Sequence, residues 1–225
     1  GWWALLSMLA ILTHFFAGFL ILPEALMLLW RLRTRVTLAA AAAVAIVQAA
    51  LLPLAIADTG HPIGWITGLP LLTRIQQVPV TFGLNTLYRS SLLSYGLLGG
   101  AIILAVAIFL IIGGTGRREL QGAGAAGALT AAVLVVPLLA ALAGHDFFIA
   151  RALIPAWVPL AVALGAACTA HRWPVPGAVV AVILLGGFGY GTIRIDGDHR
   201  YQRPDWRGVA AALGPASRAR AIVAY

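Results

Sequence analysis

Residues 92–112 read LLSYGLLGGAIILAVAIFLII, a predominantly apolar stretch without a single charged side chain. About 20 such residues form a helix long enough to cross the hydrocarbon core of a bilayer. Further apolar runs of comparable length lie on both sides of it, at residues 2–30, 36–57, 123–143, 152–170 and 175–193. The sequence therefore predicts an all-α membrane protein with six transmembrane helices.

The composition excludes a water-soluble globule. Hydrophobic residues make up 61% of the 225 residues and charged residues only 10%, whereas soluble domains carry about 25% charged residues. The net charge of +8 is the balance of 15 Arg against 7 Asp and Glu, because the chain has no Lys. These Arg side chains lie between apolar runs rather than in one patch, which favours a role in membrane topology over nucleic-acid binding.

The Arg residues alternate between the two ends of the expected bundle. Six follow the first, third and fifth runs: Arg31, Arg33, Arg35, Arg117, Arg118 and Arg172. The opposite short connections hold Arg74, Arg89 and Arg151. The positive-inside rule places the Arg-rich turns in the cytoplasm. Residue 1, residues 58–91, the turn at 145–151 and the tail after residue 193 then face outward.

The outer loop at residues 58–91 contains a short amphipathic pattern. Ile66, Leu69, Leu72 and Ile75 recur every three residues, which is typical of a helix lying in the headgroup layer. Such a helix could cap the bundle or form a lid over a cavity open to the outer leaflet. Trp65 is an aromatic expected at this interface. We expect Pro70 in the first turn of the helix.

The tail, residues 194–225, is rich in charged side chains. Pro204 and Gly214-Pro215 predict the start and end of a helix, and residues 221–224 resemble the start of a strand. We therefore expect a six-helix bundle at residues 1–193, followed by the beginning of an extracytoplasmic region. The chain begins inside an apolar run and ends inside a strand-like run, so we expect a piece of a longer protein.

Ionisable groups within or beside the apolar runs are the candidate functional residues, because charge in a bilayer is costly and such groups usually face a cavity or a partner. His14 and Glu24 lie in the first run. For His14 an interior hydrogen bond and a cavity role both fit, and for Glu24 we expect pairing with Arg31 or its basic neighbours, or contact with the inner interface. Asp146 and Arg151 lie at the outer end of the fifth run. Arg151 could bind a phosphate or reach lipid headgroups.

Several short segments resemble bacterial membrane glycosyltransferases of family 39, relatives of the protein O-mannosyltransferases and of the lipid A aminoarabinose transferase. They are THFFA at residues 13–17, Trp65-Ile66, LLTR at 71–74, Val78-Pro79, the segment from Asp146 to the RALIP at 151–155, and QRPDWR at 202–207.

This resemblance implies a fold of the C superfamily and transfer of a sugar from a polyprenyl-phosphate carrier to an acceptor on the outer face of the cell membrane. It implies that Arg151 and Arg74 bind the carrier phosphate, with Asp146 in the same group. Trp65 would contact sugar or lipid, and His14 would line the cavity. The family's general base lies in an acidic outer loop that we expect upstream of residue 1, so no catalytic residue is assigned. The chain has no metal-binding signature, and its sequence leaves open whether a divalent metal assists.

Two other functional classes fit an apolar bundle. A secondary transporter or permease would show repeated halves and broken helices with ionisable groups at mid-membrane. A non-catalytic membrane scaffold would need no Arg cluster at the outer face.

Overall fold

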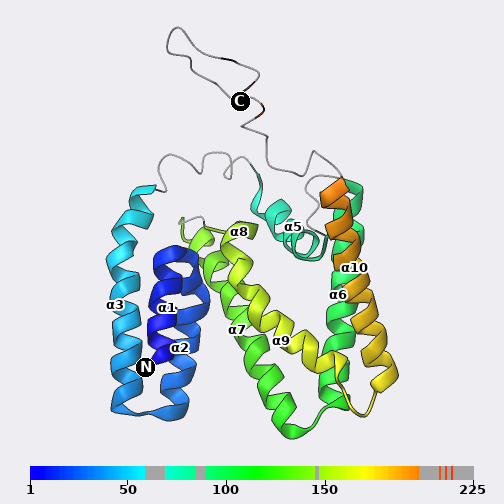
Figure 1. The fold of residues 1–225 in the computed structure, drawn as a ribbon, viewed down its shortest axis with the longest axis horizontal. Coiled ribbons are helices and arrows are strands. Elements are labelled where there is room, and N and C mark those ends of the chain that lie inside the picture. Colours follow the sequence, from blue (N-terminus) through cyan, green and yellow to red (C-terminus); the bar gives the residue numbers. More distant parts are fainter. Residues whose placement is uncertain are drawn as a thin grey trace.

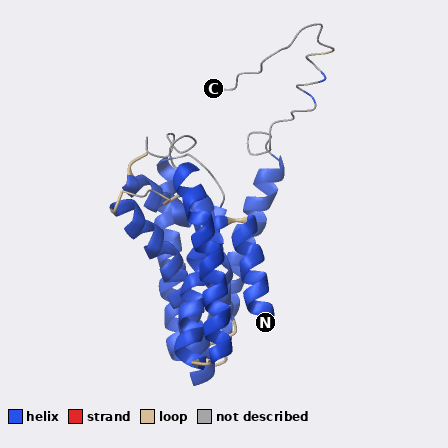
Figure 2. Cartoon of the chain, turned by 90° about the vertical axis from the view of Figure 1, so that its left-hand side faces the viewer, coloured by secondary structure: helices blue, strands red, loops and turns tan. Residues whose placement is uncertain are grey.

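The computed structural model describes residues 1–58, 69–84, 90–144 and 147–197, together with Gly208, Ala211 and Gly214. Every regular element in these ranges is a helix (Figure 2). This confirms the all-α class. The helices run between the two ends of a bundle, with short turns at one end and α5 and α8 at the other (Figure 1).

The first apolar run was predicted to form one membrane crossing, but it is divided into three helical elements. It forms α1 (Trp2–Thr13), the 3₁₀ helix η1 (Phe15–Ala17) and α2 (Gly18–Leu32). The break lies at His14, whose backbone is extended, with φ −151° and ψ 99°. In Figure 1, α1 rises from the N-terminus to this break and α2 returns toward the opposite end. The prediction that residue 1 lies on the same side as the outer loop is therefore wrong, because the extra reversal at His14 places the N-terminus away from α5 and α8. Hydropathy missed the reversal because a hairpin of two apolar helices and one long apolar helix have the same local composition.

The other helices follow the predicted runs more closely. The chain continues with α3 (Arg35–Asp58), α5 (Leu71–Leu84), α6 (Ser90–Gly114) and α7 (Arg117–Leu142). After α7 come α8 (Ala150–Leu153), the 3₁₀ helix η2 (Ile154–Ala156), α9 (Trp157–Cys168) and α10 (Pro174–Gly197). The helix α3 packs against both α1 and α2, α2 packs against α7, and α9 lies between α7, α6 and α10.

Five of the described helical stretches are long and apolar enough to cross a membrane: Phe15–Leu32, Arg35–Leu54, Arg117–Leu142, Ala150–Cys168 and Pro174–Ile193. Each corresponds to one of the predicted runs. The remaining run lies in α6, which extends over 25 residues.

Small side chains dominate the interior, and large apolar side chains dominate the outside. Ala107, Ala167 and Ala170 surround Leu110 in one cluster, whereas Leu98, Phe109 and Leu185 are more than 60% exposed. Exposed apolar area on this scale would be unfavourable in water, and it suits helices that contact lipid. Interior Ala lets backbones approach closely, as expected of helices packed within a membrane.

The Arg-rich turns all lie at one end of the bundle (Figure 1). All six of their Arg side chains are exposed. At this end the N–H of Arg172 donates to the carbonyl of Gly114 at 3.2 Å, and His171 Nδ1 lies 3.6 Å from Glu119 Oε2. These contacts join the α6–α7 turn to the α9–α10 turn.

The predicted outer helix and part of the predicted tail fall within described residues. The helix α5 begins at Leu71, and the carbonyl of Pro70 accepts its first hydrogen bond, from the N–H of Arg74 at 3.2 Å. Gly208 and Ala211 are helical, and Gly214 has φ +62° with its N–H bonded to the carbonyl of Ala211. A glycine in this conformation is typical of a helix end. The strand expected at residues 221–224 lies outside the described residues.

Candidate functional site

Two breaks in helical structure meet at the end of the bundle opposite the Arg-rich turns. One is His14 with η1, and the other is the segment from Phe147 through α8 and η2. The helix α8 packs against η1, and η2 packs against α2 and α7. Irregular backbone inside a membrane protein is tolerated where it is buried in protein or lines a water-filled space. Its concentration at one place marks this end as the candidate functional site.

Aromatic rings join the two breaks. The ring of Phe16 lies 6.0 Å from that of Phe147, centroid to centroid. His14 meets Phe16 edge to face, with centroids 5.6 Å apart and planes at 83°. Phe16 also stacks on Phe19 at 5.7 Å. His14 is exposed, so the imidazole lies on the surface of this aromatic group rather than beneath it.

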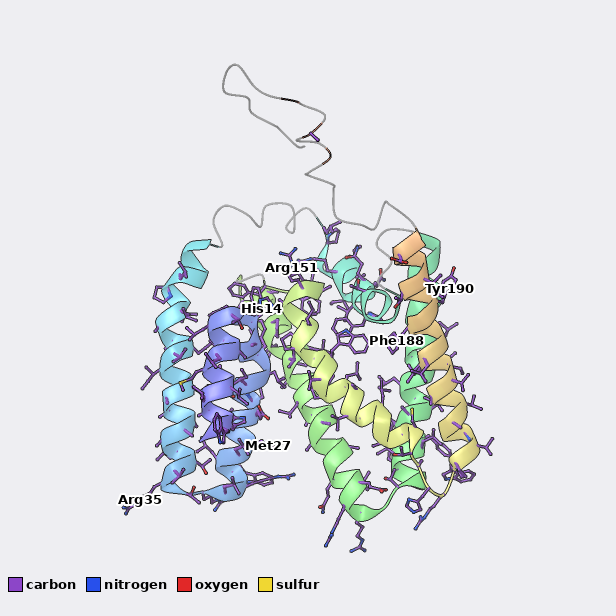
Figure 3. The ribbon with its side chains drawn as sticks, viewed as in Figure 1. His14, Met27, Arg35, Arg151, Phe188 and Tyr190 are labelled. Carbon is purple, nitrogen blue, oxygen red and sulfur yellow. The ribbon has the colours of Figure 1, made fainter. Side chains whose placement is uncertain are left out.

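Arg151 lies on α8, which packs against η1, the element that directly follows His14; Figure 3 labels both residues at this end of the bundle. The side chain of Arg151 is exposed, while the next two residues, Ala152 and Leu153, are fully buried. Within the described part of the chain, its guanidinium makes no hydrogen bond or ion pair. Arg151 therefore presents a cation at the rim of an apolar bundle, on a segment that is itself held in the interior.

Arg74 is placed differently. It lies on α5 and is only 8% exposed. Its Nε donates to the carbonyl oxygen of Leu69 at 3.2 Å, and its Nη1 donates to the carbonyl oxygen of Phe148 at 3.0 Å. The two Arg residues expected at one site thus belong to elements that pack together, α5 and α8. One guanidinium bonds the protein backbone, and the other is exposed.

Two of the predicted site residues, Trp65 and Asp146, lie outside the described residues. Of the deeper ionisable groups, Glu24 is half-buried on α2. The expected pairing of Glu24 with Arg31 is not found, because no contact joins these two described side chains. The two residues are seven positions apart on one helix, about 10 Å along its axis.

Sequence reasoning missed the residues that hold this end together. In the sequence, Phe147 and Phe148 are only two adjacent apolar residues, with nothing to single them out. A second aromatic group joins three helices: Trp157 of α9 stacks on Phe82 of α5 at 5.3 Å and meets Phe188 of α10 at 5.4 Å. These two groups attach α5 and α8 to the bundle. Aromatic residues at corresponding ends of separate runs were the available signal, but their pairing depends on the fold.

Gln48 is a further polar residue that composition did not single out. It lies on α3 against Gly18, where the absence of a side chain leaves room for its amide. The Oε1 atom of Gln48 is buried and has no hydrogen-bond partner among the described residues. The start of α2 thus depends on a glycine that accommodates a neighbouring helix.

No group of three or more His, Cys, Asp or Glu side chains suited to a metal ion occurs in the described ranges. The chemistry visible at this end is therefore that of an exposed guanidinium, an exposed imidazole and aromatic rings. A guanidinium can donate two parallel hydrogen bonds to a phosphate or carboxylate, with a geometry that Lys cannot provide.

The sequence matches no protein-family model. It also has no significant match among curated proteins or among solved structures.

Proposed function

We propose that this chain is part of a bacterial cell-membrane glycosyltransferase that takes a sugar from a polyprenyl-phosphate carrier and transfers it to an acceptor on the outer face. The observation that carries the proposal is Arg151, an exposed guanidinium on a buried segment at the end of the bundle opposite the Arg-rich turns.

The proposed arrangement has six crossings, with α2 as the first and α6 as the third. The helix α1 has only 12 residues, is too short to cross the bilayer, and precedes the first crossing. The six exposed Arg residues at the turns favour a cytoplasmic location for that end. Arg151, His14 and α5 then face outward, α5 lies in the headgroup layer, and the tail at residues 194–225 begins an extracytoplasmic region. The similarity of THFFA, LLTR and RALIP to family 39 segments supports the same assignment.

The chemistry follows from charge. Breaking the bond between the sugar and the phosphate leaves negative charge on the departing polyprenyl phosphate. A guanidinium held beside the phosphate oxygen that leaves the sugar stabilises the transition state more than the ground state, because negative charge develops on this oxygen as the bond breaks. Arg151 would supply these donors, and His14 would line the same region. We place the general base outside this chain, so catalysis requires the complete protein.

The test is replacement of Arg151 by Ala and by Lys in the complete protein, with transfer measured from a polyprenyl-phosphate sugar. We expect a loss of about 10²-fold for Arg151→Ala, comparable to removal of one transition-state donor, and partial activity for Arg151→Lys. Arg117→Ala is the matched control, because Arg117 is also exposed but lies at the opposite end. Full transfer by Arg151→Ala would contradict the proposal.

A secondary transporter is the second candidate, and specific observations favour it. The chain reverses at His14 between two apolar helices, and Glu24 lies mid-span on α2. Discontinuous helices and deep ionisable groups are typical of transport sites. Uptake of solute or protons into reconstituted vesicles that Glu24→Gln abolishes, without any glycosyl transfer, would favour this alternative.

A further inference from the structure

Arg74 has an unusual position for a cation on a helix. It is the fourth residue of α5, near the positive end of the helix dipole, where a cation is unfavourable. It is nevertheless buried, at 8% exposed. A buried charge requires hydrogen-bonded partners, and the carbonyl oxygens of Leu69 and Phe148 provide them. Tertiary contacts, rather than the preference of a helix start for negative charge, therefore account for the buried position of Arg74.

The bond to Phe148 fixes the segment that carries Arg151. Phe148 is 4% exposed and stands three residues before Arg151. The intervening Ile149 is extended, with φ −132° and ψ 151°, and α8 begins immediately after it. On the other side of the segment, the ring of Phe147 contacts Phe16. Arg74 of α5 thus contacts Phe148, and Phe16 of η1 contacts the adjacent Phe147. Two different elements therefore hold the segment 147–149.

We infer that Arg74 is a positioning residue for Arg151: it holds the carbonyl of Phe148 and thereby sets where the exposed guanidinium lies. This inference rests on the proposed function for its kinetic consequences and revises the expectation that Arg74 itself binds the carrier phosphate. A guanidinium that bonds two backbone carbonyls within the protein acts on a substrate through the segment that it holds.

A double-mutant cycle separates a positioning role from direct phosphate binding. Arg74→Ala, Arg151→Ala and the double variant are prepared in the complete protein, and kcat and KM are measured with the polyprenyl-phosphate sugar. If Arg74 acts through Arg151, Arg74→Ala alters the same kinetic parameter as Arg151→Ala. The double variant then loses less than about twofold more activity than Arg151→Ala alone. Losses that multiply would overturn the inference, because independent ligands behave additively in free energy.

Limited trypsin digestion tests the same inference without activity. Trypsin cleaves after Arg151, and because Ala152 is fully buried, cleavage requires the segment to open. Loss of a charged hydrogen bond should raise the rate of cleavage after Arg151 by about tenfold in Arg74→Ala. Gln77→Ala, on the same helix, is the matched control and should leave this rate unchanged. An unaltered rate in Arg74→Ala would overturn the inference.

The two assays distinguish the failure of each proposal. If Arg151→Ala transfers sugar normally while Arg74→Ala accelerates cleavage, the positioning contact stands and the assigned function is wrong. If Arg74→Ala does not accumulate, Arg74→Lys replaces it, because its ammonium keeps the buried charge but cannot reproduce the fork that spans both carbonyls. Cleavage after Arg151 in Arg74→Lys is expected to be faster than in the wild type, and cleavage at the wild-type rate would count against the inference.

Discussion

The Nη1 atom of Arg74 and the carbonyl oxygen of Phe148 lie 3.0 Å apart, although the two residues are 74 positions apart in the chain. This bond joins the connection between α3 and α6 to the connection between α7 and α9. Both connections were expected at one end of the bundle, and their contact joins two of the segments that resemble family 39 segments, LLTR at 71–74 and the segment that leads to RALIP at 151–155. The predictions below test the packing and the orientation on which that end depends.

Gly177 is predicted to be the glycine most sensitive to substitution. A Cβ at this position would lie 2.5 Å from the carbonyl oxygen of Cys168 and 3.1 Å from that of Ala167. Because both are backbone atoms at the end of α9, they cannot move aside as a flexible side chain would. We expect Gly177→Ala to lower the free energy of unfolding by about 1–3 kcal/mol, measured by denaturant titration in detergent.

Gly165 serves as the control for that experiment, since a Cβ added there meets no atom within 4 Å. Ala has a higher helix propensity than Gly by about 1 kcal/mol, so Gly165→Ala should be neutral or stabilising. Equal effects of the two substitutions would show that α9 and α10 do not approach as closely as the structure has them.

Leu110 should be the costliest residue to truncate in the α6–α9–α10 cluster. It is 1% exposed and packs with Ala107, Ala170 and Val180. Lipid is as apolar as a Leu side chain, so transfer from water contributes little within a bilayer. The lost contacts and the cavity dominate, and we expect Leu110→Ala to cost about 2 kcal/mol.

Thermal unfolding of Leu110→Ala and Leu104→Ala in the same detergent checks this prediction. Leu104 lies on the same helix but is 50% exposed, so its truncation leaves no interior cavity. A comparable shift in Tm for both variants would mean that Leu110 faces lipid.

The two partners at the Arg-rich end should differ in importance. His171 and Glu119 are 57% and 55% exposed, and an exposed pair of this kind contributes little. Glu119 also accepts a hydrogen bond from the N–H of Gly116 at 2.9 Å, which satisfies a free donor at the start of α7. We expect His171→Ala to be almost neutral and Glu119→Ala to cost about 1 kcal/mol. Tm values measured at low and high salt separate the contribution of the ion pair, which salt screens, from that of the hydrogen bond. A larger decrease in Tm for His171→Ala than for Glu119→Ala would contradict this ranking.

The orientation of the bundle can be measured by thiol labelling. After Cys168 is replaced by Ala, a single Cys is introduced either at Thr34 in the α2–α3 turn or at Leu72 in α5; both positions are exposed. If the Arg-rich turns are cytoplasmic, an impermeant maleimide added to intact cells labels Leu72→Cys at once. Thr34→Cys should react only after permeabilisation. The reverse pattern would invert the proposed topology and place Arg151 in the cytoplasm.

Glycine spacing illustrates how far sequence reasoning reached. Gly122, Gly124 and Gly127 are spaced as expected of glycines that let helices approach closely, yet a Cβ on any of them meets nothing within 4 Å. The close approaches occur instead at Gly18, Gly114 and Gly177. Spacing along one helix identifies a small-residue face, but it does not identify the helix that packs on it.

The sequence alone determined the helical class, the positions of the apolar runs and the alternation of Arg between the two ends, because each depends on a local sum of side-chain transfer energies over about 20 residues. It also located α5 and the two segments that carry His14 and Arg151. Only the tertiary structure decided that the chain reverses at His14, that Arg74 is buried against Phe148, and that Phe16 meets Phe147. These features arise from contacts between residues far apart in the chain, and the energy of such contacts does not appear in any local window of sequence.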